Sequence, residues 1–257
     1  MSAQSEFADL AREGGRGALV TVLRGAGEGG KLLVRADGSA EGSLGDLQEV
    51  ALRHADELMW AERSEAREEG ESLLFVDVTF PAPRLIVFGA VDYAASLVQL
   101  ARVIGWRPYV VDPRSRFATA ERFPQAEEIV VAWPEEAFRR LGGIDRATSI
   151  VVLTHDPKLD DAALTVALRS DAPYIGAMGS RRAQAARRER LLAVGLTDED
   201  LEKLAAPTGL DLGATSSEET ALSILAEVVA VRHGREGGRL SRAGGRIHEV
   251  GTPEASA

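Results

Sequence analysis

The segment from residue 84 to residue 105 constrains the fold of this chain more than any other. Four consecutive apolar residues, 85–88, run directly into Gly89, and apolar residues then recur at helical spacing up to Gly105. This pattern predicts a strand, a tight turn and a helix. A second apolar run ends at Asp112, about twenty residues beyond the glycine, where nucleotide-binding βαβ units carry an acidic residue. We therefore predict the first βαβ unit of a Rossmann-like domain.

The turn departs from the dinucleotide-binding pattern G-x-G-x-x-G. Val91 and Ala94 stand where that pattern has its second and third glycines. Alanine is a permitted variant at the third position, whereas a β-branched residue at the second blocks the approach of a pyrophosphate to the backbone. Asp92 adds a negative charge at the helix N-terminus, where a phosphate would bind. Asp92 can instead cap the helix, and the sequence leaves both roles open.

Composition limits the classes of function. The chain has 257 residues, 45% of them hydrophobic, and a net charge of -10. This length allows one large or two small domains with a sizeable core, and the negative charge argues against nucleic acid as a partner. The absence of cysteine excludes disulfides, thiol nucleophiles and zinc–thiolate sites. No apolar run is long enough for a membrane span and the first residues lack a signal-peptide pattern, so we expect a cytoplasmic protein.

Residues 1–82 are expected to form a smaller N-terminal α+β domain. A polar helix opens it, apolar runs at 18–23, 31–34 and 73–80 predict strands, and helical periodicity around 47–58 predicts a helix. The charged run 62–71 is interpreted as a solvated helix end and turn.

Proline residues at positions 81 and 83 mark the best candidate for a domain boundary. Residues 83–233 are then the Rossmann-like domain, and residues 234–257 a poorly ordered tail rich in glycine and arginine.

Residues 83–233 predict an α/β fold with a doubly wound parallel sheet. The run 148–153 is the most apolar strand of the chain and should lie centrally, covered on both faces by helices. Ligands of such sheets bind at the carboxyl ends of the strands. Three loops, 89–93, 154–161 and 176–182, should therefore converge at one edge of the sheet.

The three loops carry groups that suit an anionic ligand. The first two supply carboxylates, an imidazole and an ammonium group, and the third supplies glycine N–H groups, a hydroxyl and two arginines for a phosphate or carboxylate. Simpler roles remain open: a structural hydrogen bond for His155, an exposed helical turn for Arg181 and Arg182, and a turn for Asp211. The candidate cofactor-binding residues are Gly89, Ala90, Val91, Asp92, Tyr93, Asp112, Arg114, Thr154, His155, Asp156, Lys158, Gly176, Gly179, Ser180, Arg181, Arg182 and Asp211. No residue is assigned to catalysis or to a metal.

Five ordered motifs together resemble one known family. They are FGAVDYA (88–94), FAT with RFP (117–124), LTHDPK (153–158), YIGAMGSRR (174–182) and GLDLGA (209–214). The combination closely resembles the C-terminal Rossmann domain of the XdhC/CoxI family, accessory proteins of xanthine dehydrogenase and related molybdenum hydroxylases. The resemblance implies a chaperone, more than a turnover enzyme, that binds the molybdenum cofactor (molybdopterin). It also implies that the chain promotes sulfuration of the cofactor with a sulfurtransferase and delivers it to the hydroxylase.

The N-terminal segment departs from the family, which has a cysteine-bearing sequence where residues 45–50 here are GDLQEV. An NAD(P)- or FAD-binding Rossmann oxidoreductase is the alternative function, favoured by Asp112 and opposed by Val91 and Asp92. A protein that only binds a partner is a third.

We further expect a homodimer. A domain of about 80 residues buries little of its apolar area alone, and the helix predicted from 218 to 231 carries apolar residues on more than one face.

Overall fold

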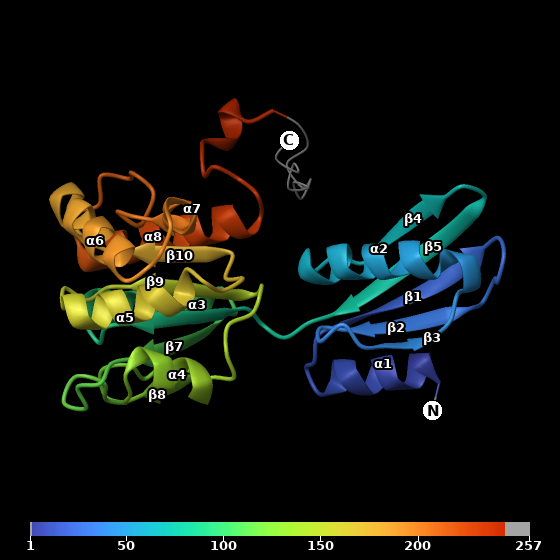
Figure 1. The fold of residues 1–257 in the computed structure, drawn as a ribbon, viewed down its shortest axis with the longest axis horizontal. Coiled ribbons are helices and arrows are strands. Elements are labelled where there is room, and N and C mark those ends of the chain that lie inside the picture. The colour runs from blue at the N-terminus through green and yellow to red at the C-terminus, as the bar shows by residue number, and fades with distance from the viewer. Residues whose placement is uncertain (1, 245–257) are drawn as a thin grey trace. The chain divides into compact units, whose positions relative to one another are not determined.

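A computed structural model describes residues 2–244; Met1 and residues 245–257 of the expected tail lie outside the described residues. The chain divides into two compact units, Met1–Ala82 and Pro83–Ala257 (Figure 1). Within residues 2–244, no helix combines the length and the apolar character that a membrane crossing requires.

The first unit is an antiparallel sheet with a helix on each face. Its strands lie in the order β3-β2-β1-β5-β4. Helix α2 covers one face, where alternate residues of the strands form an apolar core, and α1 contacts the other face (Figure 1). The elements are α1 (Ala3–Arg12), β1 (Gly17–Arg24), β2 (Lys31–Arg35), β3 (Ala40–Gly42), α2 (Gln48–Trp60), β4 (Glu65–Glu69) and β5 (Ser72–Thr79).

Strand β4 corrects the interpretation of the charged run 62–71 as a helix end and turn. Residues Glu65–Glu69 pair with β5 in an antiparallel register and form an edge of the sheet. Four of the five residues are charged, and charges on an edge strand oppose pairing with another chain. The charges of β4 therefore keep this edge of the sheet from pairing with another chain.

The second unit is a six-stranded sheet in which every neighbouring pair is parallel. The strand order β11-β10-β9-β6-β7-β8 confirms the predicted doubly wound topology. The elements are β6 (Arg84–Phe88), α3 (Asp92–Val103), β7 (Arg107–Val111), β8 (Glu128–Val130), α4 (Pro134–Arg140), β9 (Thr148–Val152), α5 (Pro157–Ala167), β10 (Tyr174–Ala177), α6 (Arg181–Ala193), α7 (Asp198–Glu202), β11 (Leu204–Ala205) and α8 (Ser217–Arg232).

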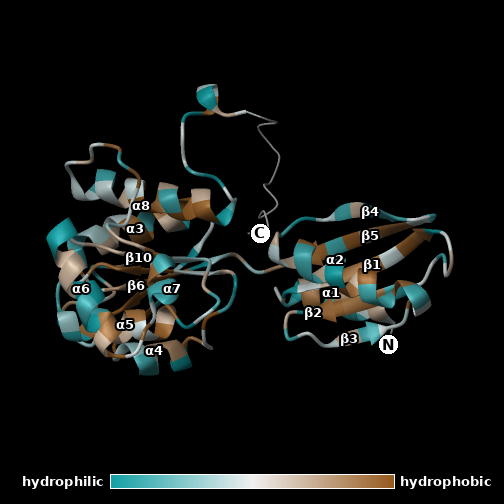
Figure 2. Cartoon of the chain, turned by 45° about the horizontal axis from the view of Figure 1, so that its top comes forward, coloured by the Kyte–Doolittle hydropathy of each residue, from teal (hydrophilic) through white to brown (hydrophobic). Residues whose placement is uncertain are grey.

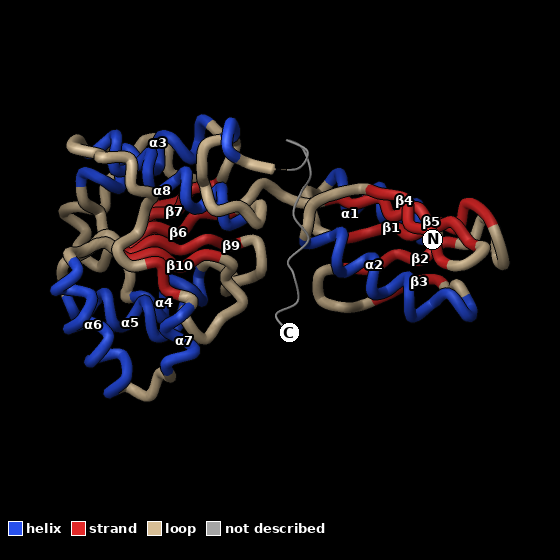
Figure 3. Tube along the Cα trace, turned by 90° about the horizontal axis from the view of Figure 1, so that it is seen from above, coloured by secondary structure: helices blue, strands red, loops and turns tan. Residues whose placement is uncertain are grey.

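Two helical layers enclose the parallel sheet. Helices α3 and α8 cover one face, and α4, α5, α6 and α7 cover the other (Figure 3). All five residues of β9 are buried, as predicted for a central strand. The brown colouring of the strands in Figure 2 shows that their residues are hydrophobic, as expected for a sheet that is covered on both faces. The chain order reverses between β6 and β9, so the edge above these two strands is the expected ligand site.

Helix α8 uses most of its apolar residues inside its own unit. Ala221, Ile224 and Val228 are fully buried and pack in the core shared with α3. Leu222 and Val231 point outward and are 51% and 42% exposed. These two exposed side chains are available to meet another surface.

Candidate functional site

The loops after β6, β9 and β10 come together at the carboxyl edge of the sheet. Gly89 has a φ of 106°, and a Cβ atom there would lie 2.5 Å from Cγ2 of Thr154 and 3.1 Å from its backbone nitrogen. The loop after β10 joins them because the Met178 N–H donates to the Val152 carbonyl at 2.9 Å. Gly89 is thus required both by backbone conformation and by this close approach.

A carboxylate at the end of β7 stabilises the turn between β6 and α3. The Ala90 N–H donates to Oδ2 of Asp112 at 2.9 Å. Val91 is the N-cap of α3, and within the described chain no side chain caps this helix. Asp92 therefore does not adopt the capping role; its carboxylate is 92% exposed and pairs with Arg122 at 2.9 Å. Tyr93, the next residue, is 37% exposed.

Asp112 is fully buried, and its carboxylate is already bound. Besides the Ala90 N–H, it accepts hydrogen bonds from the Arg114 backbone N–H and from Nε and Nη2 of Arg114, at 2.9, 2.8 and 2.7 Å. Burial alone would raise the pKa of Asp112, but the Arg114 and backbone hydrogen bonds outweigh it and lower the pKa. A ribose hydroxyl could reach this carboxylate only by displacing Arg114.

The loop after β9 is shorter than predicted, because α5 begins at Pro157 and places Lys158 in its first helical turn. Asp156 caps this helix by accepting a hydrogen bond from the Lys158 N–H at 3.0 Å. His155, Asp156 and Lys158 are all exposed, whereas Thr154 is buried.

A charge on the loop after β9 acts on an arginine of the loop after β7. The hydrogen bonds that Arg114 donates to Asp112 are the main cause of the raised pKa of Arg114, and the charge of Asp156 also raises it. The charges of Asp156 and Arg114 therefore interact across this edge of the sheet.

Gly176 has a packing role that its place in the sequence did not reveal. A Cβ at this position would lie 2.7 Å from the Tyr174 hydroxyl oxygen and 2.5 Å from Oγ1 of Thr208. The buried tyrosine runs over the glycine, and its hydroxyl donates to Oε2 of Glu227 on α8 at 2.5 Å. Burial and this carboxylate raise the pKa of Tyr174. Gly176 leaves room for a buried hydrogen-bonded cluster.

Helix α6 begins at the predicted anion loop. Gly179 has a φ of 137°, and Ser180 caps the helix by accepting a hydrogen bond from the Ala183 N–H at 3.2 Å. Arg181 and Arg182 occupy the first two helical positions and are exposed. Asp211 is also exposed; its loop reaches the same edge, because the Thr208 N–H donates to the Ala177 carbonyl at 3.1 Å.

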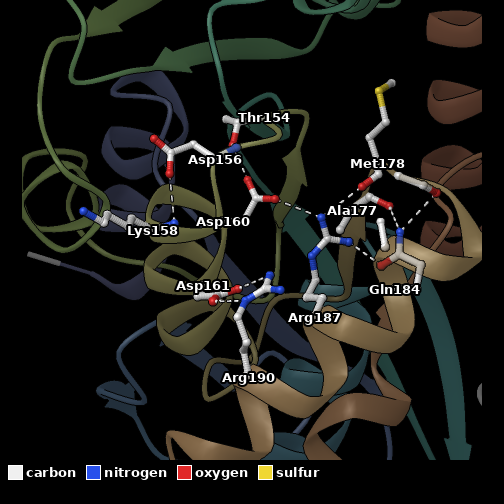
Figure 4. Close-up of polar contacts among 12 residues, drawn as sticks. Thr154, Asp156, Lys158, Asp160, Asp161, Ala177, Met178, Gln184, Arg187 and Arg190 are labelled. Atoms are coloured by element: carbon white, nitrogen blue, oxygen red, sulfur yellow. Dashed lines mark hydrogen bonds and ion pairs between the residues drawn. The ribbon is translucent and has the colours of Figure 1, made fainter.

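A buried ion pair that sequence reasoning missed connects two of the loops (Figure 4). Nη2 of Arg187 donates to Oδ2 of Asp160 at 2.9 Å and to the Met178 carbonyl at 3.0 Å. The two charged side chains are only 5% and 4% exposed. Asp160 also accepts from the Thr154 hydroxyl. The pair fixes α5, the loop after β10 and α6 to one another.

Carboxylates neutralise the later arginines of α6 but not the first two. Arg190 binds Asp161 with Nε and Nη2 at 2.6 and 3.0 Å. Within residues 2–244, Arg181 and Arg182 have no carboxylate partner. The edge thus presents exposed cations on a frame of paired charges, which suits the binding of an anion. The sequence signal for the frame was the acidic pair Asp160 and Asp161, which lies in the segment predicted as a loop.

This strand order, with the loops of β6 and β9 at the point where the order reverses, defines a Rossmann domain. The sequence model of the XdhC Rossmann domain family matches residues 85–228, which are more than half of the chain. The chain belongs to this family.

Three known proteins illustrate the relationship. A probable xanthine dehydrogenase subunit of Bacillus subtilis strain 168 is 31% identical over 159 residues, covering 62% of this chain and 46% of that protein. The molybdenum cofactor insertion chaperone PaoD of Escherichia coli K12 is 28% identical over 152 residues, covering 59% and 41%. A crystal structure described as a xanthine dehydrogenase from Bacillus halodurans is 27% identical with a TM-score of 0.60, covering 87% and 64%. The matched region is less than half of each of the first two proteins.

The buried pair gives a stability prediction. Arg187→Met should lower the free energy of unfolding by about 3–5 kcal/mol, because it leaves the Asp160 carboxylate buried without its partner. Arg188→Met is the matched control on the same helix: its partner Asp198 is 73% exposed, and the loss should stay below about 1 kcal/mol. Urea unfolding at neutral pH measures both, and equal losses would contradict the assigned role of Arg187.

Proposed function

We propose that this chain is an accessory protein that binds the molybdenum cofactor as cargo and assists its maturation and insertion into a xanthine dehydrogenase-like molybdenum hydroxylase. Membership of the XdhC family and the similarity to an insertion chaperone support this function. The observation that carries the proposal is the pair of exposed arginines, Arg181 and Arg182, at the start of α6 and at the ligand edge of the sheet.

The residues present fit the phosphate of a pterin cofactor. The first turn of α6 offers backbone N–H groups with a positive helix end, and the two guanidiniums add charge-assisted donors. The rest of the cargo would lie toward the loop of β9, where His155 and Lys158 are exposed. These groups bind and orient; none of them is paired as a nucleophile and base.

Sulfuration of the cofactor would require a partner. This chain has no cysteine and therefore no thiol of its own to carry sulfur. We propose that a sulfurtransferase supplies the sulfur while this chain holds the cargo, and that the hydroxylase then receives it.

The geometry weighs against an NAD(P)- or FAD-dependent oxidoreductase. The carboxylate that would bind a ribose, Asp112, is buried and bound to Arg114. The side chain of Val91 stands where the dinucleotide-binding pattern has a glycine, and it blocks the approach of a pyrophosphate to the backbone.

A homodimer remains part of the proposal, on a narrower basis than the sequence suggested. The N-terminal sheet has helices on both faces and needs no second copy of the chain to cover it. The remaining argument is the outward side of α8, where Leu222 and Val231 are exposed.

The direct test of the cargo is mass spectrometry of small molecules released from protein purified out of cells that make the molybdenum cofactor. A released pterin is expected. Protein that carries no pterin, even when expressed with its hydroxylase absent so that cargo accumulates, would contradict the proposal.

Arg181→Ala combined with Arg182→Ala should weaken molybdopterin binding about tenfold or more, because two charge-assisted contacts to the phosphate are lost. Arg139→Ala with Arg140→Ala, an exposed arginine pair at the end of α4, is the matched control and should bind normally. Calorimetric titration compares the dissociation constants; an unchanged value in the first double variant would remove the anion site from α6.

Light scattering at micromolar concentration should give twice the chain mass of 27.4 kDa. Leu222→Glu should shift the protein to the monomer, because a charge replaces an exposed apolar contact. Val228 is unsuitable for this test, since it is fully buried in its own unit. A monomeric wild type would rule out the dimer, and a dimeric Leu222→Glu protein would place its interface elsewhere.

A further inference from the structure

The buried cluster around Tyr174 also holds the segment 208–210, which follows β11. The Tyr174 hydroxyl and the Gly209 N–H both donate to Oε2 of Glu227 on α8, at 2.5 and 2.7 Å. Burial and the Glu227 carboxylate raise the pKa of Tyr174, so the phenol keeps its proton and donates it. The Thr208 hydroxyl then donates to the Tyr174 oxygen at 2.6 Å. One carboxylate thus joins β10, α8 and this segment.

Further contacts hold the segment 208–210 against α8. Oγ of Ser223 donates to the Leu210 carbonyl at 2.5 Å, and the Leu210 N–H donates to the Ser223 carbonyl at 3.2 Å. Gly209 has a φ of 106°, and a Cβ atom there would lie 2.5 Å from Oγ of Ser223. The segment is therefore fixed between β10 and α8 through its own backbone groups.

The loop 211–214 that follows is anchored at both ends and exposed between them. At its far end, Oε2 of Glu219 accepts hydrogen bonds from the Thr215 N–H at 2.8 Å and from the Ser216 N–H at 3.3 Å. Every residue of the loop is exposed, and within residues 2–244 the Asp211 carboxylate has no hydrogen-bond or ion-pair partner. A short loop with fixed ends loses little conformational entropy when it binds a ligand, so Asp211 is a preorganised acceptor.

The loop 211–214 lies at the same strand end as the proposed phosphate site. The Thr208 N–H donates to the carbonyl of Ala177, the last residue of β10, and the chain after Ala177 leads into the first turn of α6. Helices α6 and α8 cover opposite faces of the sheet (Figure 3). A ligand that crosses the end of β10 would therefore meet cations on the side of α6 and a carboxylate on the side of α8.

A pterin ring complements such a carboxylate. Its amino group and the neighbouring ring N–H are donors that lie side by side, and a carboxylate can accept both with its two oxygens. The phosphate of the cargo is repelled by Asp211 and attracted by Arg181 and Arg182, so charge distinguishes the two ends of the ligand.

We propose that Asp211 recognises the N–H donors of the cargo's pterin ring, and that Glu227 is a positioning residue that holds the loop of Asp211 through the Gly209 N–H. This inference rests on the proposed function for the presence of a pterin. It adds which end of the pterin is recognised and which loop recognises it.

Fluorescence titration of the full chain compares 6-hydroxymethylpterin with 6-hydroxymethyllumazine, in which an oxygen replaces the amino group. The pterin should bind about tenfold more tightly, because the oxygen cannot donate to a carboxylate. Asp211→Asn should abolish this preference, since an amide offers one acceptor and one donor group. Asp171→Asn, at an exposed aspartate that precedes β10, is the matched control and should retain it. Equal binding of the two compounds by the wild type, binding of neither, or a preference that survives Asp211→Asn would overturn the proposal.

The positioning role is tested by a double-mutant cycle. Glu227→Leu should lower the pterin affinity by about the same factor as Asp211→Asn, and Glu227→Gln should restore most of it, because one amide oxygen can accept hydrogen bonds from both donors. In the Asp211→Asn background Glu227→Leu should cause no further loss, since its effect passes through Asp211. Additive losses would overturn the positioning role. If Glu227→Leu does not fold, Ser223→Ala takes its place in the cycle, because it removes one hydrogen bond of the same segment.

The outcomes separate this inference from the cargo proposal. A pterin preference that depends on Asp211, in a protein that releases no molybdopterin in mass spectrometry, would support the pterin site and contradict the cargo. Molybdopterin released from a protein that does not prefer the pterin to the lumazine would support the cargo and overturn the role of Asp211.

Discussion

The ligand edge depends on two buried carboxylates, each paired with an arginine. Asp112 holds Arg114 at the end of β7, and Asp160 holds Arg187 between α5 and α6. A carboxylate in a protein interior is costly unless hydrogen bonds and an opposite charge compensate it. Each pair therefore commits the loops around it to one arrangement. Removing one partner of a buried pair would release the loops that it joins.

The two carboxylates respond to pH in opposite directions. Hydrogen bonds from Arg114 and two backbone N–H groups outweigh burial and lower the pKa of Asp112. This contribution to stability is present above the ordinary carboxyl pKa and is lost as the pH falls through the lowered value. For Asp160, burial is the largest effect and raises the pKa despite Thr154 and Arg187. Its contribution is present below the ordinary carboxyl pKa and lost as the pH rises through the raised value, so this pair fixes geometry at a cost in stability.

Sequence alone predicted the second unit well, because its signals are local. The apolar run into Gly89 and the helical spacing that follows specify strand, turn and helix within twenty-odd residues. Strand β4 escaped prediction because a charged edge strand lacks the apolar alternation that identifies strands. The start of α5 at Pro157 was signalled by Asp156 before a proline, a common helix opening that we treated as loop.

Long-range contacts explain what the sequence could not show about the site. Asp112 has the spacing of a ribose-binding acid, but only the folded chain shows that Arg114 and the Ala90 N–H already bind it. Gly176 suggested a phosphate loop, whereas its lack of a side chain makes room for Tyr174, whose hydroxyl meets Glu227 more than fifty residues away. Local pattern identifies which strand ends carry polar groups. It does not show which of these polar groups are already bound to other groups of the folded chain.

Some charged side chains of this edge are paired within the fold, and others are exposed. This division suits a carrier in the proposed function. The Asp160–Arg187 pair, in which both side chains are buried, is shielded from salt and holds the loops around it in place. The arginines at positions 181 and 182 are exposed, so in the proposed function each interaction with an anion would be screened by solvent and would contribute modestly. In the proposed function, several such contacts together would hold a multiply charged ligand, and each could be lost in turn when a partner offered a better site. A preformed edge with individually weak contacts thus allows cargo to be bound and then released without unfolding the domain.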